Sequence, residues 1–297
     1  MNDMNNTPII KYLVYLFLLT SAFPLCGQTK EADRSAQAEY KADNFRLFGD
    51  ITQGSLVAGV AEGAVELEVF DHKIPVGQDG RFVFGIGRDA PSQLQIHTLN
   101  KDGEKNTFTV PVKQREYDIQ RIEGVDDKYV RELSAELKKR TQAEAGQVWR
   151  ARQTLRASSE YAKGFIWPAE GPVTGVYGSQ RVFNGVPKRP HYGLDIAGPV
   201  GTPVVAPASG EVTLVNEDMY YSGGTLVIDH GQGVSSTFIH LSKIHVKSGE
   251  SIAQGQLIAE MGATGRVTGP HLDWRINWFN QRLDPALVLP PRAPKVD

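Results

Sequence analysis

Short apolar runs that end at turns dominate this chain and restrict the folds open to it. Residues 65–70 alternate apolar and acidic side chains, which is the two-residue period of a strand with one buried face. After Gly164, runs of this kind follow one another with glycine-containing turns between them. They are residues 204–206, 211–215, 225–229, 236–240 and 257–260. The pattern predicts a mainly β protein with antiparallel sheets.

The N-terminal runs predict a domain of their own. Strands are expected at residues 65–70, 81–85, 94–99 and 107–112. Strands at this spacing are typical of a small β-sandwich, which we place at residues 45–118. His72 and His97 have no second type of ligand beside them, so we interpret both as ordinary strand or surface residues. Residues 28–44 are polar and alanine-rich and are interpreted as a linker or a frayed first helix.

The middle of the chain changes character. Within residues 119–163, charged residues, glutamine and alanine dominate from residue 126 to about residue 155, and Val130, Leu133 and Leu137 recur at helical spacing. We expect one long helix or a helix pair here, as a helical linker that leads to a C-terminal β domain at residues 164–291. This helix could pack over a groove of that domain or join the two domains as a solvated spacer, and its composition favours the spacer. Residues 292–297 form a tail that is expected to be irregular.

The first residues have the features of an export signal. Lys11 precedes about a dozen mostly apolar residues, which suits a signal-peptide core better than a membrane span of about 20 residues. We therefore predict a signal peptide at residues 1–27, whose cleavage leaves no transmembrane anchor. Cys26, the only cysteine, lies at this boundary, but no small residue stands directly before it. A lipoprotein anchored through Cys26 is thus the less favoured alternative to simple secretion.

Three histidines and two aspartates of the C-terminal domain have the spacing of a metal site. They are His191, Asp195, His240, His271 and Asp273. In an extended segment, residues two or four apart point to the same face, so His191 can converge with Asp195 and His271 with Asp273. A histidine and an aspartate from the first stretch, with one group from the second, would make a three-ligand zinc site with an open position. Hydrolytic zinc centres need that open position for water or substrate.

The same stretches carry a resemblance to a known family. The HYGLD, GTPV, IHLS and TGPHL elements stand in the order found in lysostaphin/LytM-type zinc metallopeptidases, which cut peptide bonds of bacterial peptidoglycan. The chain resembles this family over roughly its last 130 residues. The resemblance implies that the C-terminal domain is an antiparallel β LytM-type peptidase domain and that its cofactor is Zn²⁺.

The resemblance also implies roles for single residues. His191 and Asp195 correspond to zinc ligands, and His240 and His271 to the two histidines that act on water and the transition state. The family's third ligand is the second histidine of a His-x-His pair, and Asp273 occupies that position here. Aspartate is an acceptable zinc ligand, although a second carboxylate leaves less charge on the metal to acidify water. We expect Asp273→His to raise zinc affinity and to keep or increase activity.

Three functions stay open at this point. The favoured one, because four of the five site residues match the family, is an exported zinc metallo-endopeptidase that hydrolyses peptidoglycan cross-links or stem peptides, by family habit in the periplasm. The alternatives are a weak or inactive LytM-type regulator that activates a cell-wall amidase, and a non-catalytic peptidoglycan-binding module. A net charge of -2 and the lack of a basic cluster with interleaved aromatics argue against a nucleic-acid partner. His230 and His245 are interpreted as a turn residue and a strand-face residue.

Overall fold

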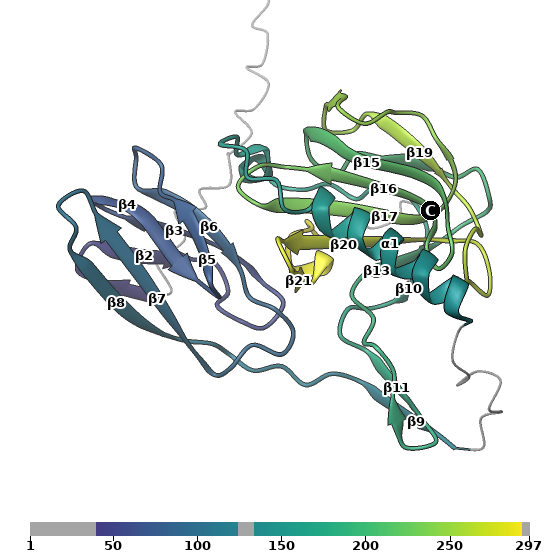
Figure 1. The fold of residues 1–297 in the computed structure, drawn as a ribbon, viewed down its shortest axis with the longest axis horizontal. Coiled ribbons are helices and arrows are strands. Elements are labelled where there is room, and N and C mark those ends of the chain that lie inside the picture. The colour runs from purple at the N-terminus through teal and green to yellow at the C-terminus, as the bar shows by residue number, and fades with distance from the viewer. Residues whose placement is uncertain (1–39, 124–133, 293–297) are drawn as a thin grey trace, which may run out of the picture. The chain divides into compact units, whose positions relative to one another are not determined.

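The computed structural model describes residues 40–123 and 134–292, and these residues are mainly β, as predicted (Figure 1). The signal peptide, Cys26 and residues 124–133 lie outside the described residues. In the part of the chain that the structure describes, no helix has the length and apolar character of a membrane span.

The N-terminal strands form two four-stranded antiparallel sheets, which confirms the β-sandwich. One sheet has the order β1-β2-β3-β6 and the other β5-β4-β7-β8. The strands are β1 (Tyr40–Ala42), β2 (Phe45–Phe48), β3 (Leu56–Ala61), β4 (Ala64–Val69), β5 (His72–Pro75), β6 (Arg81–Gly85), β7 (Gln93–Asn100) and β8 (Lys105–Pro111).

Aromatic side chains fill the centre of the sandwich. The buried ring of Phe45 stacks on Phe82 at 5.6 Å and on Phe108 at 4.2 Å between centroids, so it joins the two sheets. Burial of rings of this size supplies much of the hydrophobic stabilisation of a small domain. The strand β1 lies within residues 28–44, which differs from the linker expected there, because its three residues pair with β2.

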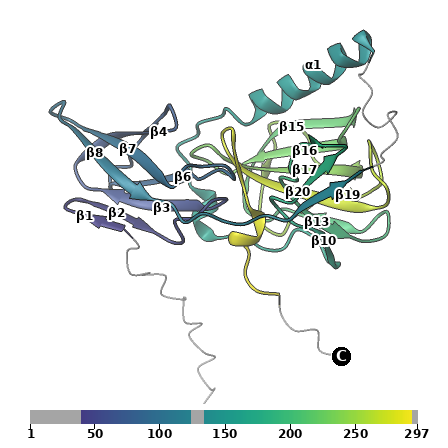
Figure 2. The ribbon, with the colours of Figure 1, turned by 90° about the horizontal axis from the view of Figure 1, so that it is seen from below.

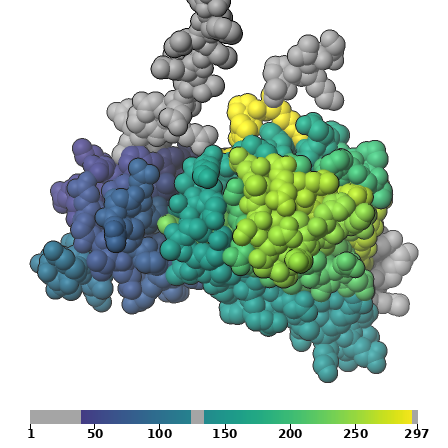
Figure 3. All heavy atoms as spheres, turned by 90° about the horizontal axis from the view of Figure 1, so that it is seen from above, coloured from purple at the N-terminus to yellow at the C-terminus, as the bar shows by residue number. Residues whose placement is uncertain are grey.

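The C-terminal strands form one large antiparallel sheet with the order β10-β13-β20-β17-β16-β15-β18. Two further pairings extend it: β19 pairs with β14 and β17, and β21 pairs with β20. The strands are β10 (Val173–Gly175), β13 (Leu194–Ala197), β14 (Pro203–Val205), β15 (Gly210–Met219), β16 (Gly223–Asp229), β17 (Val234–Ile244), β18 (Ser251–Ile252), β19 (Leu257–Met261), β20 (His271–Trp278) and β21 (Gln281–Leu283). Residues 247–249 of the turn after β17 are exposed. Yellow-green atoms of this part of the chain form part of the surface in Figure 3.

Strand β20 positions the site through its two-residue period. Leu272, Trp274, Ile276 and Trp278 have no exposed area and face the hydrophobic core. The residues between them are polar: His271, Asp273, Arg275 and Asn277. Because successive side chains of a strand point to opposite faces, this polar set shares the face away from the core.

The helix α1 (Ala135–Ala151) lies across one face of the large sheet, over β15 and β16 (Figures 1 and 2). Its first turn is capped by Ser134, whose hydroxyl accepts a hydrogen bond from the Leu137 amide. Glu144 accepts from the Tyr220 amide at 3.0 Å, and Gln147 accepts from Asn216 at 3.2 Å. The helix is therefore packed on the sheet, which differs from the solvated spacer that its composition favours.

The segment predicted as a helical linker begins with a strand. Residues Ile119–Ile122 form β9, which pairs in parallel with β11 (Gln180–Phe183), and β11 pairs with β12 (Val186–Pro187). All four residues of β9 are exposed, so apolar burial gives no pattern by which the sequence could indicate this strand. The chain thus adds a strand to a hairpin of the C-terminal domain before it enters the helix.

Candidate metal centre

Two aspartates face each other on neighbouring strands. Asp195 of β13 is the register partner of Asp273 of β20, and β17 places Ile239 on the other side of Asp273. Like charges directly opposite each other on a sheet are unfavourable. Asp273 is also 3% exposed, so its charge is removed from water. This pair of carboxylates therefore requires a cation beside it.

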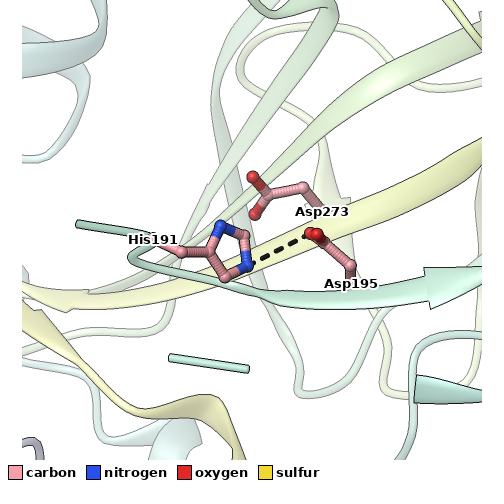
Figure 4. A group of neighbouring side chains, drawn as sticks. All are labelled: His191, Asp195 and Asp273. Carbon is pink, nitrogen blue, oxygen red and sulfur yellow. Dashed lines mark ion pairs between the residues drawn. The ribbon is translucent and has the colours of Figure 1, made fainter. Parts of the chain in front are cut away.

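His191 completes a group of three potential ligands. It stands just before β13, and its Nε2 lies 3.2 Å from Asp195 Oδ1 (Figure 4). Ligand atoms of His191, Asp195 and Asp273 all lie within 4.8 Å of one another. The structure thus brings together the three residues predicted as ligands, although the strand starts at Leu194 and His191 precedes it. Burial acts to lower the pKa of His191, but the two carboxylates raise it overall.

The closest pair in this group has the geometry of two metal ligands. His191 Nε2 and Asp195 Oδ1 are buried, out of line for a mutual hydrogen bond, and without any other hydrogen-bond partner. Zinc ligands at about 2.0–2.2 Å from the ion stand about 3.3–3.6 Å apart at the corners of a tetrahedron. The observed separation of 3.2 Å lies just below that edge. Buried polar atoms without partners are rare, and a cation between these two atoms would satisfy both.

Arg275 is the residue that sequence reasoning missed. Its Nε donates to Asp273 Oδ1 at 3.0 Å and its Nη2 donates to Oδ2 at 2.6 Å, a bidentate ion pair. Burial acts to raise the pKa of Asp273, but the Arg275 guanidinium lowers it, so the carboxylate stays ionised. Each carboxylate oxygen has two acceptor positions, so Oδ1 keeps one for a metal ion. The donor set therefore fits a divalent metal, with Arg275 as a competing cation.

The two other predicted histidines lie side by side next to this group. The rings of His240 and His271 are 4.9 Å apart between centroids. Each ring Nδ1 lies 2.9 Å from a backbone carbonyl, that of Thr264 for His240 and that of Gly269 for His271. A carbonyl only accepts, so Nδ1 carries the hydrogen and Nε2 is left with a lone pair. Burial lowers the pKa of His240, which favours its neutral form.

His240 reaches this place through an unusual backbone conformation. Its φ is +67°, and its amide donates to the carbonyl of Ser222 at 2.8 Å outside the regular ladder. A positive φ is uncommon for a residue other than glycine and breaks the strand alternation that places Phe238 in the core. The strand prediction for residues 236–240 is confirmed, but the period of two does not account for His240.

Gly193 provides the space that Asp273 occupies. A Cβ atom on Gly193 would overlap Asp273 Oδ1, and one on Gly175 would overlap Asp195 Oδ2. We expect Gly193→Ala to displace the Asp273 carboxylate and to weaken metal binding at least about tenfold, since outer-shell changes alone have effects of 10–100-fold. The measurement is a zinc titration of the purified variant. Gly146→Ala in α1, where a Cβ would approach only the end of the Arg150 side chain at 3.3 Å, is the control. An unchanged zinc affinity would contradict the assignment of Asp273 as a ligand.

The group opens into a pocket of about 730 Å³. His191, Asp195 and Arg275 lie on one side of it, and residues near β9 and β11 lie on the other. The positive side chains in its lining are Arg181, Lys188, Arg189 and Arg275, against the carboxylates of Asp118 and Asp195. A molecule bound in this pocket thus lies beside the predicted metal ligands His191 and Asp195 and meets an excess of positive charge.

The remaining histidines lie apart from the site. His72 stacks on Phe279 at 4.6 Å, His97 contacts Thr107 Oγ1 at 2.9 Å, and His245 pairs with Glu260 at 3.0 Å. Among the described residues, the only group with metal-ligand spacing is His191, Asp195 and Asp273.

His230, interpreted from the sequence as a turn residue, lies directly after β16 and is fully buried. Its ring nitrogens contact the Ser209 carbonyl at 2.7 Å and Ser236 Oγ at 2.8 Å. Burial lowers its pKa to about 4. The unfolded chain, with a histidine pKa near 6.5, binds more protons between pH 6.5 and 4, so stability falls as the pH falls through this window.

We expect His230 to contribute about 3 kcal/mol to this loss of stability, at 1.36 kcal/mol for each pKa unit. Urea unfolding at pH 7 and pH 4.5 measures it. In His230→Gln, the difference in unfolding free energy between the two pH values should shrink, whereas the exposed His97→Gln should leave it unchanged. An equal difference in all three proteins would show that other groups govern the acid sensitivity.

The comparisons with known proteins agree with this geometry. The family model "Peptidase family M23" matches residues 189–285, which contain all five site residues. The chain carries a peptidase family M23 domain. The M23 domain resembles the peptidoglycan DD-endopeptidase ShyB of Vibrio cholerae, with 39% identity over 129 residues. That alignment covers 43% of this chain and 28% of ShyB.

Two further relatives extend the comparison. An NlpD/LppB lipoprotein homolog of Pseudomonas aeruginosa is 33% identical over 129 residues, 43% of this chain and 41% of that protein. The chain thus spans less than half the length of these curated relatives. The solved structure of a Pseudomonas aeruginosa protein named for peptidase M23 superposes with a TM-score of 0.64 and 28% identity. It covers 81% of this chain and 95% of that one, so the likeness extends beyond the M23 domain.

Proposed function

We propose that this chain is a metal-dependent endopeptidase that hydrolyses a peptide bond of peptidoglycan, in a cross-link or a stem peptide. The observation that carries the proposal is the pair of buried, unpartnered atoms His191 Nε2 and Asp195 Oδ1, 3.2 Å apart beside Asp273. A hydrophobic or hydrogen-bonded arrangement would have been the less costly solution at this place. The kinship with peptidoglycan endopeptidases supports the substrate class.

His191, Asp195 and Asp273 would hold the metal, with zinc as the ion that suits a histidine-carboxylate set. When bound, the metal supplies Lewis acidity toward the scissile carbonyl. Arg275 fixes the orientation of the Asp273 carboxylate through two hydrogen bonds. A carboxylate held in this way keeps its position whether or not a substrate is present.

His240 and His271 would move the protons of the reaction. Because both rings donate through Nδ1 to backbone carbonyls, each offers an Nε2 lone pair. One Nε2 accepts the proton of the attacking water, and the resulting imidazolium returns a proton to the leaving amine. The lowered pKa of His240 keeps this ring neutral and ready to accept at pH 7.

A second candidate function rests on Arg275. This guanidinium already neutralises Asp273 and would repel a divalent cation placed beside it. A domain of this kind could bind wall peptide or a cell-wall amidase without hydrolysis. The NlpD/LppB homolog and the cell division protein DipM of Caulobacter vibrioides are relatives whose names describe no hydrolysis.

We also propose export to the periplasm, from the apolar N-terminal stretch.

Mass spectrometry of peptidoglycan digests tests the proposed function. Purified wall is incubated with the protein, with and without added zinc, and with a chelator. We expect new peptide fragments that increase with zinc and vanish with chelator or with His240→Gln. His245→Gln, a histidine away from the site, should digest like the wild type. Intact wall under every condition, with folded and zinc-loaded protein, would favour the regulator.

A further inference from the structure

Three arginines follow one another along the site face of the sheet. Arg275 lies two residues beyond Asp273 on β20, and Arg282 of β21 is the register partner of Asn277. Arg152, just after α1, reaches the same Asn277 from the helix side. We call Arg275, Arg282 and Arg152 the arginine row. It begins at the metal centre and extends away from it.

Only the first member of the row has a carboxylate partner. Arg275 pairs with Asp273, whereas Arg282 and Arg152 each donate one long bond of 3.4 Å to Asn277 Oδ1. Among the described residues, no carboxylate lies within ion-pair distance of either. Arg152 is 6% exposed and its buried Nε has no hydrogen-bond partner. A buried cation without an anion is strongly unfavourable, so an anion placed beside Arg152 and Arg282 would stabilise this part of the row.

Hydrogen-bond donors next to the arginine row also lack acceptors. On β17, Ser235 lies opposite Asn277 and Thr237 opposite Arg275, and both hydroxyls are buried without a partner. Burial, together with the nearby charge of Arg275, lowers the pKa of Arg152 to about 10. Burial and its two neighbours in the row also lower the pKa of Arg282. These groups can all donate hydrogen bonds, and they face one another.

The row is continuous with the pocket described above. Arg275 lines that pocket together with Arg189 and Tyr192. The Nη1 of Arg275 makes no hydrogen bond within the described part of the chain, and its side chain is 25% exposed. The guanidinium of Arg282 stands 5.7 Å from the centre of the Tyr192 ring, which is the same wall. Arg275 thus lines the pocket itself, and the partly buried Arg282 stands beside Tyr192 of the same wall.

We propose that the arginine row is an anion subsite that binds a carboxylate of the ligand next to the metal centre. The planar forks of Arg275 and Arg282 suit a carboxylate, as the pairing of Arg275 with Asp273 illustrates. Asp118 and Asp195 line the same pocket and would repel a doubly charged phosphate more than a singly charged carboxylate. The subsite thus selects peptides that carry a carboxylate close to the bond at the metal centre.

A free C-terminal carboxylate is the most direct ligand of this kind. A peptide that ends close to the scissile bond would place its terminus on Arg282, whereas an amidated end would leave the arginines unpaired. This inference rests on the proposed function for the nature of the ligand, a wall peptide. It predicts that binding distinguishes the acid from the amide even where no bond is cut.

Equilibrium binding tests the subsite without hydrolysis. The probes are acetyl-D-alanyl-D-alanine and its C-terminal amide, titrated calorimetrically into the metal-depleted full chain. We expect the acid to bind at least about tenfold more tightly than the amide, in line with the strength of hydrogen bonds between charged groups. Arg282→Gln should remove most of this preference. Arg150→Gln, an exposed arginine at the same end of α1, should keep it.

Thermal unfolding serves as the second measurement. Without ligand, Arg282→Gln and Arg152→Gln should unfold at or above the wild-type temperature, because each removes an unpaired charge. Equal affinity of the wild type for acid and amide would overturn the subsite, as would a preference that survives in Arg282→Gln. A preference for the acid in a protein that never cuts wall would keep the subsite and reject the endopeptidase, so the two proposals fail separately.

Discussion

Asp195→Ala is expected to abolish stoichiometric zinc binding and to lower wall hydrolysis at least about 100-fold, since even residues behind the ligands change affinity or activity by 10–100-fold. The same change should leave the metal-free protein as stable as the wild type, or more stable. Asp195 lies directly opposite Asp273, and removal of one carboxylate relieves the repulsion between them. A site built for a cation thus predicts opposite effects on function and on stability.

Zinc titration and thermal unfolding of the metal-free protein measure the two effects. Asp118→Asn is the matched control, because Asp118 is another carboxylate of the same pocket. It should keep one zinc per chain. If Asp195→Ala kept one zinc per chain, or if the control lost it equally, the ligand assignment would be wrong and pocket charge alone would attract the metal.

From the sequence, Asp273→His alone is expected to raise zinc affinity, but the pairing of Arg275 with Asp273 changes this expectation. We now expect the gain in affinity only when Arg275 is replaced as well. In the single variant, Arg275 loses its sole carboxylate and stands as a partly buried cation beside the incoming metal. Loss of one partner from a buried ion pair costs about 3–5 kcal/mol. The pair is a quarter exposed on the arginine side, so we expect the lower end of this range. The double variant Asp273→His with Arg275→Met removes the competing positive charge and leaves the metal two histidines and Asp195 as ligands.

A double-mutant cycle on zinc affinity checks this coupling. The variants are Asp273→His, Arg275→Met and their combination, with the wild type as the fourth corner. We expect the combination to bind zinc at least about tenfold more tightly than the product of the single effects predicts, which corresponds to a coupling of about 1.4 kcal/mol. Additive effects would show that Arg275 does not oppose the metal through Asp273. Arg266→Met, an arginine that contacts Tyr221 instead, controls for loss of positive charge.

The group of His191, Asp195 and Asp273 could be predicted from sequence because its members obey short-range rules. His191 and Asp195 are four residues apart, and His271 and Asp273 are two apart on one strand, so spacing alone indicates convergence. The β-sandwich and the strands β14, β15, β16, β17 and β19 of the large sheet were predictable for a similar reason. Apolar periodicity reflects burial on one face, and it is visible without knowledge of the neighbours.

Features that depend on distant partners left no such pattern. Arg275 stands two residues after Asp273, so the two-residue period of a strand places both side chains on one face and indicates this cation as well. The packing of α1 depends on polar contacts with residues in and directly after β15. A charged helix surface gives no pattern in the sequence that indicates such contacts. The left-handed backbone at His240 is likewise set by the loop of Ser222, eighteen residues away in the chain.

The parallel strand β9 bears on how this architecture is inherited. The family match starts at residue 189, yet Asp118 and Gln120 line the same pocket as His191. An exchange of genetic material at the family boundary would therefore divide one binding site between two ancestors. Recombination that kept residues 118–122 with the sandwich would pass on part of the pocket wall. The predicted metal ligands would be inherited with the other segment. The pocket beside the predicted ligands is thus built from residues on both sides of the family boundary.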